Sequence, residues 1–188
     1  KSNQPFTIGN HTIVFNGEIY NFLGLKEILL SEGHQFQTVG DTEVLLLWLI
    51  HKGIECINEV EGMFAFSWFN KITKELILCR DSLGIKPLYI YEDHENLIFA
   101  SEIKSIFALY PNSKKIDKSL IAEYLLNGFI YEPDTGFDKI RKLKPGSYEK
   151  YDLQGNLITK KQYWELSKIS TDKTIRKSKE INKEIKSS

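Results

Sequence analysis

The chain has 188 residues, enough to bury one hydrophobic core of ordinary size. Its 25 Lys and Arg residues balance its 25 Asp and Glu residues, which excludes a general electrostatic attraction to nucleic acid or to an anionic membrane. The longest apolar run, residues 44–50, is too short to span a bilayer. We therefore expect neither a nucleic-acid partner nor a membrane.

The cysteines and histidines give no sign of a metal or redox centre. Cys56 and Cys79 form no C-x-x-C pair and have apolar neighbours, so we expect reduced, buried thiols in a cytoplasmic protein. The four histidines lack the spacing of metal ligands. No glycine-rich phosphate loop of the Walker or dinucleotide type is present, and we expect no metal and no cofactor in this domain.

A strand is predicted over residues 11–15, followed by Asn16 and Gly17. Asn-Gly between β-prone residues is the strongest short-range signal of a hairpin turn, which is the reading that composition alone favours. The alternative is an oxyanion hole, in which the Asn16 side-chain amide and the Gly17 backbone N–H point at one developing negative charge. The residues alone leave both interpretations open.

Two helices are predicted next, over residues 22–32 and 41–51, ended by Gly33 and Gly53. Asp41 is predicted to be the N-cap of the second helix, because its carboxylate suits the free N–H groups and the positive end of the helix dipole. A second interpretation is that its charge also meets a cationic group on a ligand. A short helix or turn is expected over residues 54–60.

Residues 63–69 and 76–79 are uncharged runs of strand length, which predicts strands buried on both faces with covering layers above and below. Arg80 and Asp81 follow, and charges at the end of a buried strand are expected to pair or to form local hydrogen bonds. A structural corner is the favoured interpretation of this loop. Further strands are expected at 89–91 and 97–100, and then a helix with Ser101 as its N-cap.

The last part of the core sequence predicts a helix over 118–127, capped by Asp117 and stopped by Gly128. Residues 129–142 read as irregular. The Lys144-Pro145-Gly146 turn introduces a hairpin over 147–152 and 157–160. From residue 167 the chain is rich in Lys and Ser and is expected to be a linker or an exposed helix. These elements predict an α/β domain with two mainly antiparallel sheets and helices outside.

Five motifs occur in the order and spacing of a known family. The sequence resembles the glutamine-hydrolysing domain of asparagine synthetases, a class II glutamine amidotransferase of the N-terminal-nucleophile hydrolase fold, over about residues 5 to 165. The motifs are Phe15-Asn16-Gly17-Glu18-Ile19-Tyr20-Asn21, Gly40-Asp41-Thr42-Glu43-Val44, Glu61-Gly62-Met63-Phe64-Ala65-Phe66, Arg80-Asp81-Ser82-Leu83-Gly84-Ile85-Lys86-Pro87-Leu88-Tyr89 and Ala100-Ser101-Glu102-Ile103-Lys104.

The resemblance implies an α+β fold, a four-layer αββα sandwich of two mainly antiparallel sheets. It implies a type 2 glutamine amidotransferase domain over residues 1–166 and a Lys-rich linker, 167–188, towards a synthetase domain. The family's leading Cys nucleophile and its Arg-bearing glutamine-binding loop are absent from this sequence and are expected to precede Lys1. Neither Cys56 nor Cys79 matches that nucleophile, so we expect this chain by itself to be inactive.

The resemblance also implies a reaction and its residues. In the family, the N-terminal Cys attacks the glutamine side-chain amide with its own α-amino group as base, and the ammonia released passes to the second domain. Asn16 and Gly17 correspond to the oxyanion hole, Glu18 belongs to the same glutamine-binding segment through its backbone, and Asp41 corresponds to the carboxylate that holds the glutamine α-ammonium. A further hypothesis is that Arg80, Asp81 and Glu102 face the synthetase domain and seal the ammonia path.

The whole enzyme implied is an ATP-dependent asparagine synthetase that converts aspartate to asparagine with glutamine as nitrogen donor. ATP and Mg²⁺ are expected in the synthetase domain. The expected partners are glutamine and that domain, and a homodimer is left open.

Two alternative functions also stay open. The domain could serve an amidotransferase with a sugar or a cell-surface polymer precursor as acceptor, or it could be a non-catalytic binding module that keeps the fold.

Overall fold

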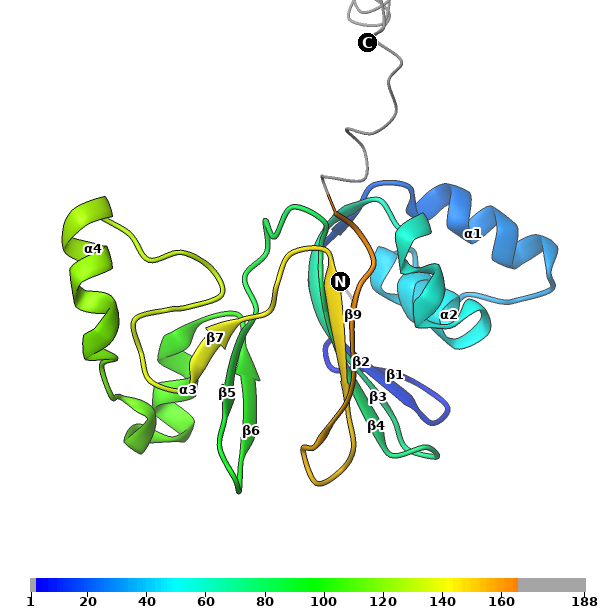
Figure 1. Ribbon diagram of the computed structural model, residues 1–188. Coiled ribbons are helices and arrows are strands. Elements are labelled where there is room, and N and C mark those ends of the chain that lie inside the picture. Colours follow the sequence, from blue (N-terminus) through cyan, green and yellow to red (C-terminus); the bar gives the residue numbers. More distant parts are fainter. Residues whose placement is uncertain (1–2, 166–188) are drawn as a thin grey trace, which may run out of the picture.

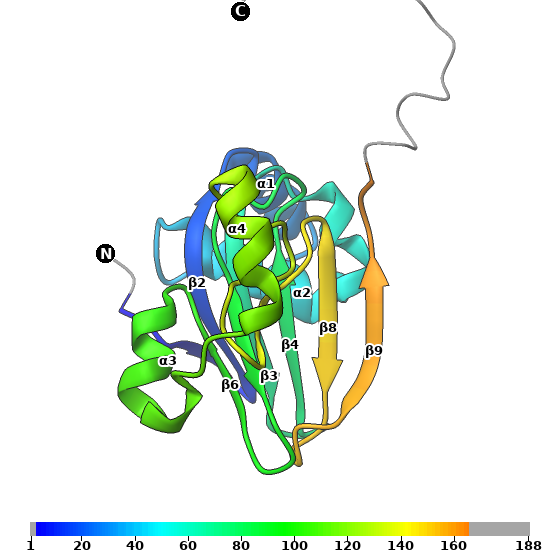
Figure 2. The same ribbon diagram turned by 60° about the vertical axis from the view of Figure 1, so that its left-hand side comes forward.

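The fold consists of four layers stacked as helix, sheet, sheet and helix. The computed structural model describes residues 3–165. The predicted linker, 167–188, and Lys1 lie outside the described residues. Figure 1 shows α1 and α2 packed on one side of a large sheet, a small sheet on its other side, and α3 and α4 beyond the small sheet. In the turned view of Figure 2, α3 and α4 lie in front of the strands and α1 and α2 lie behind them. The predicted four-layer αββα sandwich is confirmed.

The large sheet has six strands in the order β1-β2-β3-β4-β8-β9, and the small sheet has three in the order β6-β5-β7. Every strand pair in both sheets is antiparallel. The strands of the large sheet are β1 Phe6–Ile8, β2 His11–Ile19, β3 Gly62–Asn70, β4 Glu75–Arg80, β8 Ser147–Tyr151 and β9 Leu157–Gln162. The small sheet consists of β5 Tyr89–Glu92, β6 Leu97–Ala100 and β7 Ile140–Lys142.

The helices match the predicted positions closely. They are α1 Phe22–Ser31, α2 Asp41–Lys52, α3 Ile103–Leu109 and α4 Ile121–Asn127. Short 3₁₀ helices occupy Ile54–Glu59, Pro111–Ser113 and Lys118–Leu120. As predicted, Asp117 caps the turn before α4 by accepting from the Ser119 N–H, and Gly128 ends the helix in a left-handed conformation. The helix predicted at 118–127 therefore begins as a 3₁₀ turn.

The packing of the central strand β3 explains why its sequence carries no charge. Phe64 and Phe66 point into the core shared with α1 and α2, whereas Ala65 points into the core between the two sheets. All three are buried, as expected for a strand covered on both faces. Burying a phenylalanine side chain stabilises a fold by about 1.5–3 kcal/mol. The alternating side chains of β3 therefore pack against the helices on one face and against the small sheet on the other. The prediction of a doubly buried strand is confirmed.

An ion pair joins the two sheets inside the sandwich. Arg141 on β7 donates to both carboxylate oxygens of Glu149 on β8, at 3.1 and 2.7 Å. The Tyr151 hydroxyl donates to the same carboxylate at 2.5 Å. Burial alone raises the pKa of Glu149, but hydrogen bonds from Arg141, Tyr151 and Lys160 outweigh it and leave that pKa below its ordinary value. The carboxylate therefore stays charged although its side chain is fully buried.

Two predictions about local structure were wrong. Asn16 and Gly17 are not a turn, because β2 runs without interruption from His11 to Ile19 against β3. Long-range pairing with β3 overrides the local turn preference of Asn-Gly. The segment 129–142, predicted to be irregular, contains the short strand β7, which forms because β5 offers a free edge at Tyr89–Glu92.

Within residues 3–165, none of the helices has both the length and the apolar character needed to cross a membrane. The same residues contain no group of three or more His, Cys, Asp or Glu side chains placed to hold a metal ion.

Candidate functional site

The candidate site lies at the C-terminal end of β2, where two predicted donors are neighbours. Asn16 pairs with Ala65 across the sheet and so faces the space between the two sheets. Its side-chain N–H donates to the hydroxyl of Ser101 at 3.2 Å. A small cavity of about 100 Å³ adjoins Asn16 between the sheets, with Ser67 and Phe99 among its walls. Because an amide nitrogen carries two hydrogens, Asn16 keeps a second N–H for a ligand.

Gly17 is needed at its position because no side chain fits there. A Cβ atom on Gly17 would lie 2.2 Å from the backbone oxygen of Met63 and 2.7 Å from the Cα of Phe64. On the opposite strand, a Cβ on Gly62 would lie 2.2 Å from the backbone oxygen of Glu18. These two glycines therefore allow β2 and β3 to approach closely at the site.

The backbone N–H of Gly17 points away from β3, towards the open side of β2. Two residues before it, the Phe15 N–H donates to the Gln4 side chain at 2.6 Å, and two residues after it, the Ile19 N–H donates to Asp41 at 3.1 Å. Backbone N–H groups of every second residue in a strand point to the same side. The Gly17 N–H thus lies between Gln4 and Asp41 on one edge, where a ligand could accept from it.

Asp41 is not the N-cap that the sequence predicted. Gly40 occupies the cap position, and Asp41 is the first residue of α2. The Asp41 carboxylate instead accepts from the Ile19 backbone N–H, which ties α2 to the end of β2. This bond brings a carboxylate next to the Asn16-Gly17-Glu18 segment, although 22 residues separate Asp41 from Ile19 in the sequence. A carboxylate beside two N–H donors can hold a ligand that carries both an ammonium group and a carbonyl.

Glu18 on β2 and Glu43 on α2 have different structural roles. The side chain of Glu18 is exposed and its backbone oxygen lies against Gly62, and its contribution to ligand binding through the backbone stays a prediction. Glu43 is buried and accepts from the backbone N–H groups of Gln37 and Thr38 at 2.8 and 2.5 Å. It therefore fixes the loop that leads to Asp41, a function that the sequence did not reveal.

Arg80 and Asp81 are buried and hold the loop after β4 in place. The Asp81 carboxylate accepts from four backbone N–H groups at 3.0–3.2 Å, those of Phe64, Leu83, Ile85 and Lys86. Arg80 donates to the backbone oxygens of Gly84, Lys86 and Leu143 and to the carboxylate of Glu132. The predicted local hydrogen bonding is confirmed. Because both side chains point inward, any effect on a neighbouring domain acts through the loop that they support.

Glu102 lies at the surface beside the site. Its carboxylate forms an exposed ion pair with Lys104 at 2.5 Å, and it occupies the cap position of α3. The prediction of Ser101 as that cap was wrong, since α3 begins at Ile103. Ser101 instead accepts the hydrogen bond from Asn16. Of the three predicted interdomain residues, Glu102 is the one whose side chain is available to a partner.

The two cysteines lie outside the site. Cys79 is fully buried in the core between the large sheet and α1 and α2, on the opposite face of the sheet from Asn16. Burial raises the pKa of Cys79 well above its ordinary value and that of Cys56 to a smaller extent. Both groups are therefore held as neutral thiols, which are poor nucleophiles.

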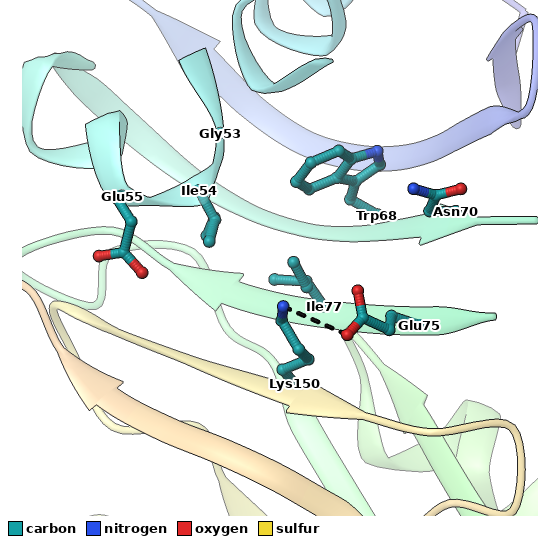
Figure 3. Close-up of a pocket in the computed structure, with 8 residues that line it drawn as sticks. All are labelled: Gly53, Ile54, Glu55, Trp68, Asn70, Glu75, Ile77 and Lys150. Carbon is teal, nitrogen blue, oxygen red and sulfur yellow. Dashed lines mark hydrogen bonds and ion pairs between the residues drawn. The ribbon is translucent and has the colours of Figure 1, made fainter. Parts of the chain in front are cut away.

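A larger pocket lies on the other face of the large sheet. Figure 3 shows Trp68 and Ile77 on its floor and the Glu75–Lys150 ion pair at its edge. Its volume is about 280 Å³. Trp68 and Ile77 belong to the same core as Cys79, so the sheet separates this pocket from Asn16. It is not part of the candidate site.

Sequence reasoning missed Gln4 and Ser101 as site residues. The Gln4 side chain accepts from the N–H of Phe15 and donates to its backbone oxygen, at 2.6 and 2.7 Å, as a neighbouring strand would. No local pattern around Gln4 indicates this contact. Ser101 lies in a motif that the sequence singled out, and its position after a strand was the available signal.

The comparison with protein families matches residues 1–164 to the model of the glutamine amidotransferase domain. The chain belongs to this family. The glutamine amidotransferase domain described here is 40% identical over 163 residues to asparagine synthetase [glutamine-hydrolyzing] 1 of Bacillus subtilis (strain 168), covering 86% of this chain and 26% of that protein. It is 43% identical over 157 residues to a putative asparagine synthetase [glutamine-hydrolyzing] 2 of Methanocaldococcus jannaschii, covering 82% of this chain and 30% of that protein.

Among solved structures, the domain is similar to glutamine phosphoribosylpyrophosphate amidotransferase from B. subtilis, solved with ADP and GMP. The TM-score is 0.61 at 22% identity, and the match covers 85% of this chain and 31% of that chain. This likeness supports the N-terminal-nucleophile hydrolase fold. The amidotransferase domain spans about a quarter to a third of the length of the curated relatives named here.

Proposed function

We propose that this glutamine amidotransferase domain supplies ammonia from glutamine within a longer, ATP-dependent asparagine synthetase that converts aspartate to asparagine. The observation that carries the proposal is the grouping of the Asn16 amide, the Gly17 N–H and the Asp41 carboxylate at one end of β2. The similarity to glutamine-hydrolysing asparagine synthetases supports the choice of acceptor.

In the proposed reaction, an N-terminal cysteine of the longer protein attacks the side-chain amide carbon of glutamine. Negative charge develops on the amide oxygen, where Asn16 and Gly17 donate hydrogen bonds to it. The α-amino group of that cysteine takes the thiol proton and passes it to the amide nitrogen, so that the C–N bond breaks and ammonia leaves; water then hydrolyses the thioester to release glutamate and the free thiol. Asp41 binds the α-ammonium group of glutamine, which favours glutamine over amides that lack an amine.

The remaining steps belong to the rest of the protein. ATP and Mg²⁺ act in the synthetase part, where aspartate is activated and receives the ammonia. A cytoplasmic location suits this proposal, and a homodimer is not required by it.

The test uses the purified full-length protein, with its N-terminal residue determined. Glutamate formation is measured with glutamine, and asparagine formation with aspartate, Mg²⁺-ATP and either glutamine or ammonium. We expect an N-terminal Cys and asparagine from both nitrogen donors. Asn16→Ala should lower the glutamine-dependent rate by about 10²–10³-fold and leave the ammonium-dependent rate unchanged. The exposed residue Asn112 supplies the matched control, Asn112→Ala.

Two results would contradict the proposal. Glutamate formation without asparagine from either donor would indicate another acceptor, such as a sugar or a polymer precursor. A native protein without an N-terminal Cys and without glutamate formation would leave the fold as a binding module.

A further inference from the structure

Helix α4 presents an apolar surface that nothing within residues 3–165 covers. None of its seven residues is buried, and Leu125 and Leu126 are 76% and 84% exposed. Figure 1 shows α4 at the outer edge of the molecule, beyond the small sheet. Five of the exposed apolar side chains of α4 and of the turn after it form what we call the α4 face, made of Tyr124, Leu125, Leu126, Phe129 and Tyr131.

The α4 face is held in a defined shape. The Glu123 carboxylate accepts from the Tyr131 backbone N–H at 2.7 Å, which folds the segment after α4 back onto the helix. The Phe129 and Tyr131 rings pack edge to face, with centroids 4.8 Å apart. Helices shorter than about 12 residues are marginal in water without tertiary packing. A seven-residue helix with four large apolar side chains exposed to water, followed by two more at Phe129 and Tyr131, therefore calls for a covering partner.

A cavity beside α4 offers a place for a partner's side chain. It has a volume of about 300 Å³, and its walls are mostly apolar, with Ile116, Ile121, Tyr124 and Phe137 among them. Apolar pockets of this kind receive the anchoring side chains of protein interfaces.

A short series of contacts joins the α4 face to the candidate site. Next to Tyr131, the Glu132 carboxylate accepts from Arg80 at 2.9 Å. The adjacent Asp81 accepts from the Phe64 N–H at 3.2 Å, and Phe64 pairs with Gly17 across the sheet. A partner on the α4 face therefore lies a few contacts from the proposed oxyanion donor.

We infer that the α4 face is the docking surface for the synthetase part of the same polypeptide, and this inference rests on the proposed function. About three-quarters of the B. subtilis relative lies outside the match, so the longer protein offers a tethered partner. Tethering raises the effective concentration of a partner, so a small apolar surface is sufficient. A stable pair of separate chains typically buries about 800 Å² on each partner, which is more than one short helix provides. The partner surface is apolar and places a large side chain in the cavity.

The test compares hydrogen exchange in the full-length protein and in two variants of it. Leu125→Glu combined with Leu126→Glu places charges on the α4 face while keeping good helix formers. Ile72→Glu is the matched control, since Ile72 is 70% exposed on the turn between β3 and β4. We expect the amides of residues 124–131 to exchange at least about tenfold more slowly in the wild type and in the control than in the double variant.

The same proteins are assayed for ammonia transfer. The double variant should form glutamate at the wild-type rate but give several-fold less asparagine per glutamate. Rapid exchange of residues 124–131 in the wild type, or equal exchange in all three proteins, would overturn the inference. Protection that is lost on dilution would identify a second copy as the partner and would also overturn it. A wild type that forms no glutamate would count against the proposed function, while hydrogen exchange would still decide whether the α4 face is covered.

Discussion

The Asp41 carboxylate lies 3.1 Å from the backbone nitrogen of Ile19, a contact that joins the first residue of α2 to the last residue of β2. This hydrogen bond brings a negative charge to the strand end that carries Asn16 and Gly17. Helix and strand together therefore set the distance between the proposed ammonium-binding group and the proposed oxyanion donors.

Asp41→Asn keeps an oxygen that can accept from Ile19 but removes the charge. A charge-assisted hydrogen bond contributes about 1.5–3 kcal/mol, so we expect the KM for glutamine to rise about 10–100-fold in the full-length protein. The turnover number should change little, because the ammonium group is remote from the reacting carbonyl. Steady-state kinetics check this, with Asp117→Asn at the start of another helix as control. An unchanged KM would refute the role of Asp41.

Gly17→Ala should destabilise the fold, since its Cβ would meet the backbone of Met63 and Phe64. Forcing an atom into a packed site costs about 1–3 kcal/mol. The matched substitution is Gly24→Ala in α1, where a Cβ has open space, and it should stabilise the chain by about 0.5–1 kcal/mol. Urea denaturation midpoints of the two variants should shift in opposite directions. A neutral Gly17→Ala would show that the two strands can separate at the site.

Asp81→Asn replaces one carboxylate oxygen with an NH₂ group that faces backbone donors. The Asp81 carboxylate is buried and satisfies one N–H group of β3 and three of the loop after β4, so we expect a loss of about 2–4 kcal/mol in the free energy of unfolding. Asp152 accepts similar backbone bonds in an exposed turn, from Gln154 and Asn156. Asp152→Asn should cost less than about 1 kcal/mol, because water replaces the lost bonds. Equal losses in the two variants would contradict the importance of burial.

Acid should weaken the ion pair between the sheets. The pKa of Glu149 is lower in the folded protein than its ordinary value of 4.5, so the charged form favours folding. This contribution is fully present above about pH 4.5 and is lost as the pH falls through the lowered pKa. Urea denaturation of the wild type and of Glu149→Gln, measured from pH 6 to pH 3, should show a stability difference that narrows below about pH 4. Parallel curves would show that Glu149 titrates normally.

The layers and most element positions follow from local pattern, but the site does not. The uncharged run at β3 indicates burial on both faces because each side chain of an alternating strand must meet a covering layer. Asn16 and Gly17 mislead local reasoning, since their turn preference is small beside the pairing of nine residues with β3. Asp41 is a good cap by type, yet the Ile19 N–H competes for its carboxylate. Contacts such as that of Gln4 with Phe15 form only once the chain is folded, and no pattern in the neighbouring sequence indicates them.

The edge of β2 that faces away from β3 near Gly17 also affects whether other molecules can pair with the sheet. A strand edge with free N–H and C=O groups can recruit a strand from another chain and so begin aggregation. Gln4 occupies both backbone groups of Phe15, and Asp41 occupies the N–H of Ile19. An incoming strand would have to displace both side chains, whereas a single oxygen atom could reach the Gly17 N–H between them. The edge thus discourages a polypeptide and admits a small ligand.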